Sequence, residues 1–141
     1  MPSTKNTALA DVKIDVKIKL AGLWASLMFC YVYGDYFGLY KPGKLDNMLR
    51  GRMGPLGEVT QGVLLGTSIM MAIPALMVYL CLTMKPAVSR WANIVLGLAY
   101  AAIMVLTMRG AWDFYLFYGV VEILLCLLIV GHAWKWPRAQ A

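Results

Sequence analysis

Two carboxylic acids lie inside stretches of the chain that are otherwise apolar, and these two residues are the best placed to do chemistry. Glu122 lies well inside the apolar residues 114–134, too far from either end for its short side chain to reach water across a bilayer. Placing an acid near the centre of a bilayer costs on the order of 2.5–3.5 kcal/mol. Glu122 therefore needs a hydrogen-bond partner, a water-filled cavity or a bound proton.

Two interpretations of Glu122 are open. On a helix, Tyr118 and Cys126 lie one turn away on the same face. As a functional group, Glu122 would bind a proton or a cation from a cavity, which is the default role of an acid inside a membrane. As a structural group, it would be a protonated acid hydrogen-bonded to a tyrosine or asparagine of another helix.

Asp35 is the second acid, and it follows Tyr31 by one helical turn. It lies nearer the end of its apolar run than Glu122 does, so it is easier to hydrate. One interpretation is an interfacial ion pair with Arg109 or a basic residue of the following loop, which would fix the helix end. The other is a polar pocket at the outer mouth, into which the neighbouring tyrosines donate hydrogen bonds.

Asn93 shares a helix face with Gly97 and Tyr100, and we expect its amide to bond to another helix. The lone histidine, His132, lies one turn from the end of the last apolar run, where we expect a headgroup-level residue and not a ligand. The candidate binding residues are Glu122, Asp35, Tyr118, Tyr31, Asn93 and Tyr100.

Several chemistries are disfavoured by what the sequence lacks. Cys30, Cys81 and Cys126 are odd in number, fall in three different apolar runs and form no Cys-x-x-Cys pair, which argues against thiol–disulfide exchange. One histidine and scattered carboxylates do not make a metal site. The sequence has no phosphate-binding glycine loop, nucleophile elbow or haem-binding histidine pair. We predict no catalytic residue, metal or cofactor.

The elements that position these residues follow from hydropathy. Hydrophobic residues make up 61% of the 141 residues and charged residues 14%. Four apolar runs, at about residues 20–40, 60–84, 91–108 and 114–134, approach or exceed the roughly 20 residues that a membrane span needs. A span must satisfy its own backbone hydrogen bonds, so each run should be a helix. Because residues 63–82 and 94–108 have no polar stripe, a soluble helical protein is disfavoured. We predict an all-α integral membrane protein, a four-helix transmembrane bundle forming one domain over residues 1–141.

The connecting segments combine several local patterns. Residues 1–19 form a charged leader, and residues 11–20 alternate polar and apolar residues, which favours a strand. A bundle offers no sheet to join, so we prefer an interfacial helix that starts at about residue 12, with Asp15 and Lys19 paired. The alternative is an extended arm that pairs with another chain. The loop at residues 41–59 contains glycine–proline turns. The short loops at residues 85–90 and 109–113 predict tight hairpins, and Pro74 should bend its helix. The tryptophans should form an interfacial belt, and they are Trp24, Trp91, Trp112, Trp134 and Trp136.

Four crossings place both ends of the chain on one side of the membrane. The basic residues of that side outnumber those of the other, so the positive-inside rule places both termini in the cytoplasm. The two sets are Lys5, Lys13, Lys17, Lys19, Lys85, Arg90, Lys135 and Arg138, against Lys41, Lys44, Arg50, Arg52 and Arg109. We assign the net charge of +6 to orientation and anionic-lipid contact, not to nucleic-acid binding.

Short motifs along most of the chain are similar to those of a known family. The more specific are Arg90-Trp91-Ala92-Asn93 and the closing Ala133-Trp134-Lys135-Trp136-Pro137; the others are Leu23-Trp24, Tyr33-x-Asp35 and Glu122. Together they resemble a family of short bacterial membrane proteins known only as a domain of unknown function. The resemblance covers about residues 20–137 and implies a bacterial four-helix inner-membrane protein, with no activity.

Three functional hypotheses remain. The first is binding or transport of a proton, a cation or a small lipophilic solute through a bundle cavity, by a homo-oligomer. The second is a non-catalytic accessory subunit of a larger membrane complex, with Glu122 as a specificity bond. The third, an enzyme acting on a lipid or quinone, has no visible nucleophile or cofactor site.

Overall fold

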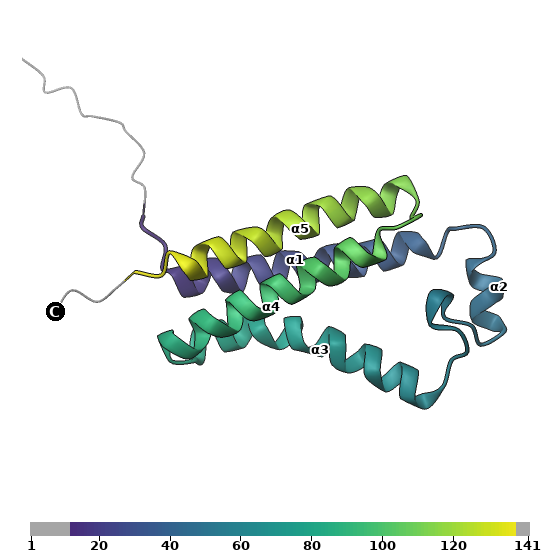
Figure 1. The fold of residues 1–141 in the computed structure, drawn as a ribbon, viewed down its shortest axis with the longest axis horizontal. Helices are drawn as coiled ribbons and strands as arrows, with labels where there is room; N and C mark the ends of the chain where they lie inside the picture. The colour runs from purple at the N-terminus through teal and green to yellow at the C-terminus, as the bar shows by residue number, and fades with distance from the viewer. Residues whose placement is uncertain (1–11, 138–141) are drawn as a thin grey trace, which may run out of the picture.

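Four long helices dominate the structure, a computed structural model that describes residues 12–137 (Figure 1). They are α1 (Val16–Gly38), α3 (Gln61–Thr83), α4 (Pro86–Thr107) and α5 (Asp113–Trp134), while the short α2 (Lys44–Leu49) and a 3-10 turn (Gly54–Leu56) lie in the first loop. All four long helices are long and apolar enough to cross a membrane. The predicted fold class is confirmed: this is an all-α, multi-pass membrane protein whose helices contact lipid.

Helix α1 begins later than the predicted interfacial helix and earlier than the predicted span. Residues 12–15 are not helical, and within the described chain they join no strand. The Asp15 carboxylate accepts a hydrogen bond of 2.8 Å from the Lys17 amide, so it is the N-cap of α1. The expected Asp15–Lys19 ion pair is therefore wrong, because the carboxylate serves the helix end instead.

Lys17 lies inside the helical part of α1 and ties this helix to α3. Its Nζ donates to the carbonyl oxygens of Leu82 (3.2 Å) and Met84 (2.8 Å) at the end of α3. The last carbonyls of a helix have no partner within the helix, and a lysine there also complements the helix dipole. These two hydrogen bonds explain how Lys17 is accommodated within α1: its ammonium group is bound by the carbonyl oxygens at the end of α3.

The order of packing around the bundle is α3, α1, α5 and α4. Helix α1 packs against both α3 and α5, and α5 packs against α4. The turn between α3 and α4 is as short as predicted, but these two helices make little contact, and Figure 1 shows α3 leaving the others towards its Gln61 end. The expected tight hairpin is therefore wrong, because α3 is held by α1.

The core lies in the half of the bundle that holds the two termini. Its buried residues are Leu20, Ala21, Trp24, Leu27, Met77, Cys81, Tyr100, Cys126 and Ile129. Trp24 is fully buried, so its assignment to the interfacial belt is wrong. The reason is the early start of α1 at Val16, which places Trp24 two turns inside the helix. Trp91, Trp112 and Trp134 are exposed, as belt residues would be.

Helices α4 and α5 approach closely at Gly97. A Cβ atom added to Gly97 would lie 2.9 Å from Val130 Cγ2 and 3.3 Å from the carbonyl oxygen of Cys126. Such an approach is typical of membrane helices that pack through small residues. A Cβ atom added to Gly38 or Gly66 would meet nothing within 4 Å, so these two glycines do not bring helices together in the described structure.

Candidate functional site

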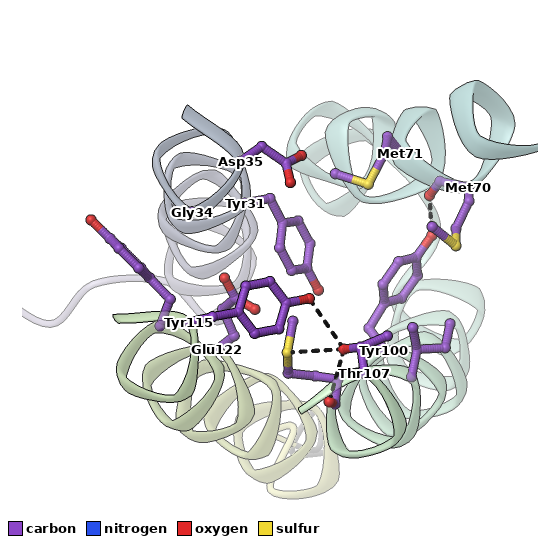
Figure 2. A pocket seen from close by; sticks show the side chains of 12 residues that line it. Tyr31, Gly34, Asp35, Met70, Met71, Tyr100, Thr107, Tyr115 and Glu122 are labelled. Atoms are coloured by element: carbon purple, nitrogen blue, oxygen red, sulfur yellow. Dashed lines mark hydrogen bonds between the residues drawn. The ribbon is translucent and has the colours of Figure 1, made fainter. Parts of the chain in front are cut away.

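A cavity of about 150 Å³ lies between all four long helices (Figure 2). Helix α1 supplies three lining residues, α3 two, α4 four and α5 three. They are Tyr31, Gly34, Asp35, Met70, Met71, Tyr100, Ile103, Met104, Thr107, Tyr115, Tyr118 and Glu122. Five of the six candidate residues from the sequence therefore line one cavity, although they come from three helices.

Glu122 is the most buried acid of the described chain. It is only 2% exposed, and its Oε2 atom has no hydrogen-bond partner among residues 12–137. A buried polar atom without a partner costs roughly 1–3 kcal/mol, so each such atom calls for an explanation. The bond from a tyrosine or asparagine that the structural interpretation requires is not made to Oε2 within this part of the chain. The side chain lines the cavity, where a bound molecule or proton would reach it.

Tyrosines make up much of the remaining polar lining. Figure 2 shows Tyr31 and Tyr100 pointing into the space between the helices, and their ring centroids are 6.5 Å apart. Tyr115 donates to Thr107 Oγ1 at 3.3 Å, which links α5 to α4. Tyr118 stacks on Phe37 of α1, with ring centroids 6.4 Å apart. These rings give the cavity apolar faces with hydroxyl groups at fixed positions.

Tyr100 has a second role that depends on Pro74. Proline has no N–H, so Pro74 leaves the carbonyl of Met70, one turn earlier in α3, without its helical partner. The Tyr100 hydroxyl donates a hydrogen bond to this carbonyl. Neighbouring helices commonly satisfy backbone groups freed by a proline in a membrane helix. Tyr100 thereby holds α3 and α4 together beside the cavity, although these helices contact each other little elsewhere.

Asp35 lines the cavity on the side of the first loop and is exposed. No ion pair joins it to Arg109 or to a lysine or arginine of the first loop within residues 12–137, so the interfacial pair that we considered is not formed. A second hollow of about 340 Å³ shares Gly34, Asp35 and Tyr115 with the cavity and is also lined by Lys41, Lys44 and Arg52. The cavity thus adjoins a basic vestibule formed by the first loop.

Asn93 is the candidate residue that lies outside the cavity. Its Oδ1 accepts from Trp24 Nε1 at 2.7 Å, and its Nδ2 donates to the carbonyl oxygen of Ser89 at 2.7 Å. The Cys81 thiol donates to the same Oδ1 at 3.4 Å. Asn93 therefore makes the interhelical bonds expected of its amide, and it is fully occupied in joining α1, α3 and α4.

Four further lining residues were not among the candidates predicted from the sequence: Met70, Met71, Met104 and Thr107. Met104 and Thr107 follow Tyr100 at helical spacing, so they share its face, and that spacing could have identified them. Met70 and Met71 come from α3, and no local pattern distinguishes them from lipid-facing residues. Methionine is flexible and polarizable, so these side chains can adapt to ligands of different shape.

No cluster of three or more metal-ligating side chains occurs in the part of the chain that the structure describes. His132 is partly buried and lines a separate hollow at the other end of the bundle, among Lys13, Lys19 and Lys135. The cavity therefore offers one buried carboxyl group, one exposed carboxyl group and several hydroxyl groups for binding.

Comparison with known proteins agrees with the resemblance seen in the sequence. No curated protein and no solved structure matches the chain. A family model, described as a family of unknown function (DUF6326), matches residues 11–141. The chain therefore belongs to this uncharacterised family.

Proposed function

We propose that this protein binds a small lipophilic solute in the cavity between its four helices and carries it within the membrane, with Glu122 as the polar contact. The observation that carries this proposal is that Glu122 lines the cavity and that its Oε2 atom is buried without a hydrogen-bond partner among residues 12–137. A solute that donates a hydrogen bond or carries a positive charge would supply the missing partner.

The size and lining of the cavity support a compact solute. A volume of about 150 Å³ equals that of an engineered cavity in another protein that holds benzene. Tyr31 and Tyr100 would contact a ring or a cation by their faces, and Met71 and Met104 would adapt to its outline. A hydrated metal cation is less well matched, because only one buried carboxylate is available and metal sites need several ligands.

The test uses three probes that share one ring and differ in their polar group: benzylamine, benzyl alcohol and toluene. Binding to the detergent-solubilised protein is followed by saturation-transfer NMR. We expect the wild type to bind benzylamine and benzyl alcohol more tightly than toluene. Glu122→Gln should lower the affinity for benzylamine about tenfold and leave the affinity for toluene unchanged. Glu58→Gln is the matched control, because Glu58 is the other glutamate and is exposed in the first loop. Equal binding of all three probes by the wild type would contradict the proposal.

An accessory subunit of a larger membrane complex is the second candidate, and one observation favours it. The buried residues of α3 are Pro74, Met77 and Cys81, so none lies in the first half of this helix. Apart from Met70 and Met71, which line the cavity, that half is free to contact lipid, a second copy or a partner protein. Mild-detergent purification of a tagged chain tests this candidate: a stoichiometric partner protein whose co-purification Leu65→Arg abolishes would support it, and a homo-oligomer alone would contradict it.

For the location, we propose the inner membrane of a bacterium, with both termini in the cytoplasm. The support is the excess of basic residues at the end of the bundle that holds the termini. Reporter fusions after residue 137 and within the first loop test the orientation. A fusion after residue 137 that is active only outside the cytoplasm would overturn it.

A further inference from the structure

Arg90 lies outside the cavity, and the proposed function gives it no role. It belongs to the second turn of α4, at the end of the bundle where α1 starts and α5 ends (Figure 1). Its Nε atom is buried and has no hydrogen-bond partner among residues 12–137. Together with Glu122, it is one of the two residues of the described chain with such an atom.

Two tryptophans stand beside the guanidinium group. Its central carbon lies 5.8 Å from the ring centroid of Trp91 in α4 and 6.0 Å from that of Trp134 in α5. These distances suit a cation–π contact, which orients the planar guanidinium without using its N–H donors. Both indoles are exposed, at 58% and 62%. Exposed indoles at a helix end mark the headgroup level of a bilayer.

No carboxylate of the described residues pairs with this cation. Within residues 12–137, Asp15 is the acid at this end of the bundle, and its carboxylate accepts from the Lys17 amide. The same end carries five lysines, Lys13, Lys17, Lys19, Lys85 and Lys135, in addition to Arg90. The local charge is therefore strongly positive, and an anion from outside the chain would be attracted to it.

An apolar groove next to the arginine indicates what kind of anion this is. This groove is a shallow, open hollow on one face of α4, formed by Ala87, Val88, Trp91, Ala92, Val95 and Leu96. It follows α4 from the headgroup level into the apolar part of the helix. Trp91 belongs both to this groove and to the pair of rings beside Arg90. A molecule with a phosphate and an acyl chain would satisfy both features, whereas free phosphate would leave the groove empty.

We propose that Arg90, flanked by Trp91 and Trp134, binds the phosphate of an anionic phospholipid whose acyl chain lies in the groove of α4. Arginine suits this role because its fork of N–H donors matches two phosphate oxygens, while lysine offers a single point of charge. The site lies at the opposite end of the bundle from the basic vestibule and does not depend on the cavity.

The test is native mass spectrometry of the delipidated full chain titrated with phosphatidylglycerol, with phosphatidylcholine as the zwitterionic comparison. We expect one phosphatidylglycerol to be retained by the wild type, and Arg90→Lys and Arg90→Gln each to weaken its binding about tenfold. Lys135→Gln is the matched control, because it removes one charge beside Trp134 without touching the guanidinium; it should change binding less than twofold.

Three results would overturn the proposal. Arg90→Lys with wild-type affinity would show that charge alone suffices. An equal loss in Lys135→Gln would show diffuse attraction to the whole basic end. Full competition by inorganic phosphate would show that the acyl chain contributes nothing. Because Arg90→Lys keeps the charge and the length of the side chain, an unchanged size-exclusion profile will separate loss of binding from loss of fold.

Discussion

The hydroxyl of Tyr100 in α4 donates a hydrogen bond to the carbonyl of Met70 in α3. This is the carbonyl that Pro74 leaves without a helical donor, so a backbone group freed by a proline in one helix is satisfied by a tyrosine of another. The bond crosses the pair of neighbouring helices that otherwise contact each other least. It also forms part of the cavity wall, so the shape of the cavity and the position of α3 depend on the same hydroxyl.

Tyr100→Phe should therefore destabilise the fold, and the loss should depend on Pro74. Interhelical hydrogen bonds in membranes contribute about 0.6 kcal/mol on average and up to about 1.7 kcal/mol. In the otherwise wild-type chain we expect the free energy of unfolding to fall by an amount near the upper value, because Tyr100 is the donor that the Met70 carbonyl has in the described structure. In a Pro74→Ala background the helix supplies its own N–H, so the same substitution should cost much less. Unfolding in mixed micelles, arranged as a double-mutant cycle, measures the difference. Equal losses in both backgrounds would contradict this coupling.

Glu122→Met should stabilise the protein while removing its polar contact with the solute. Methionine has a similar length and leaves no unpartnered oxygen, so the fold should gain about 1–3 kcal/mol. Equilibrium unfolding of the variant in mixed micelles provides the measurement, with Glu58→Met as the exposed control that should change stability little. A destabilised Glu122→Met would mean that the carboxyl group has a structural partner, which would favour the structural interpretation.

Trp24 and Asn93 form the polar centre of the other half of the bundle. Trp24→Phe removes the donor to Asn93 Oδ1 and leaves that oxygen with only the weak Cys81 thiol. We expect the free energy of unfolding to fall by about 1–3 kcal/mol because this buried oxygen loses its donor. It should fall further because the smaller ring leaves part of the volume empty. Trp112→Phe, at an exposed position, should change stability by less than about 0.5 kcal/mol. Thermal unfolding followed by circular dichroism compares the two. Equal stability changes in the two variants would contradict the buried, hydrogen-bonded position of Trp24 and would favour a place for it in the interfacial belt.

The sequence predicted the elements well because hydropathy is local information. All four long helices overlap their predicted spans, and the acids were recognised as unusual from their apolar neighbours alone. Errors arose where one residue finds its partner far along the chain. Lys17 is accommodated inside α1 by the carbonyls of Leu82 and Met84, and no pattern near Lys17 indicates this. The resulting early start of α1 moved Trp24 into the core.

The same reasoning applies to the site. Tyr31 and Asp35 could be grouped because helical spacing puts them on one face, and so could Tyr118 and Glu122. That these two faces meet, and that α3 closes the cavity with Met70 and Met71, depends on helix packing that no local pattern encodes. Asn93 was included among the candidates because a buried amide has the same sequence signature whether it binds a solute or another helix.

Gly97 sets the separation of α4 and α5, and so the position of Tyr100 relative to Glu122. An added Cβ would meet the Val130 side chain at 2.9 Å and the backbone oxygen of Cys126 at 3.3 Å. The side chain can turn away but the backbone cannot, so Gly97→Ala should push the helices apart at a cost of about 1–3 kcal/mol.

Gly66→Ala in α3 is the matched control, because its Cβ would meet nothing within 4 Å, and it should be neutral or slightly stabilising. Unfolding in mixed micelles measures both variants, and benzylamine binding should weaken only in Gly97→Ala, since the cavity lies one turn further along the same pair of helices. If Gly97→Ala binds and unfolds like the wild type, the contact of α4 with α5 does not set the geometry of the cavity.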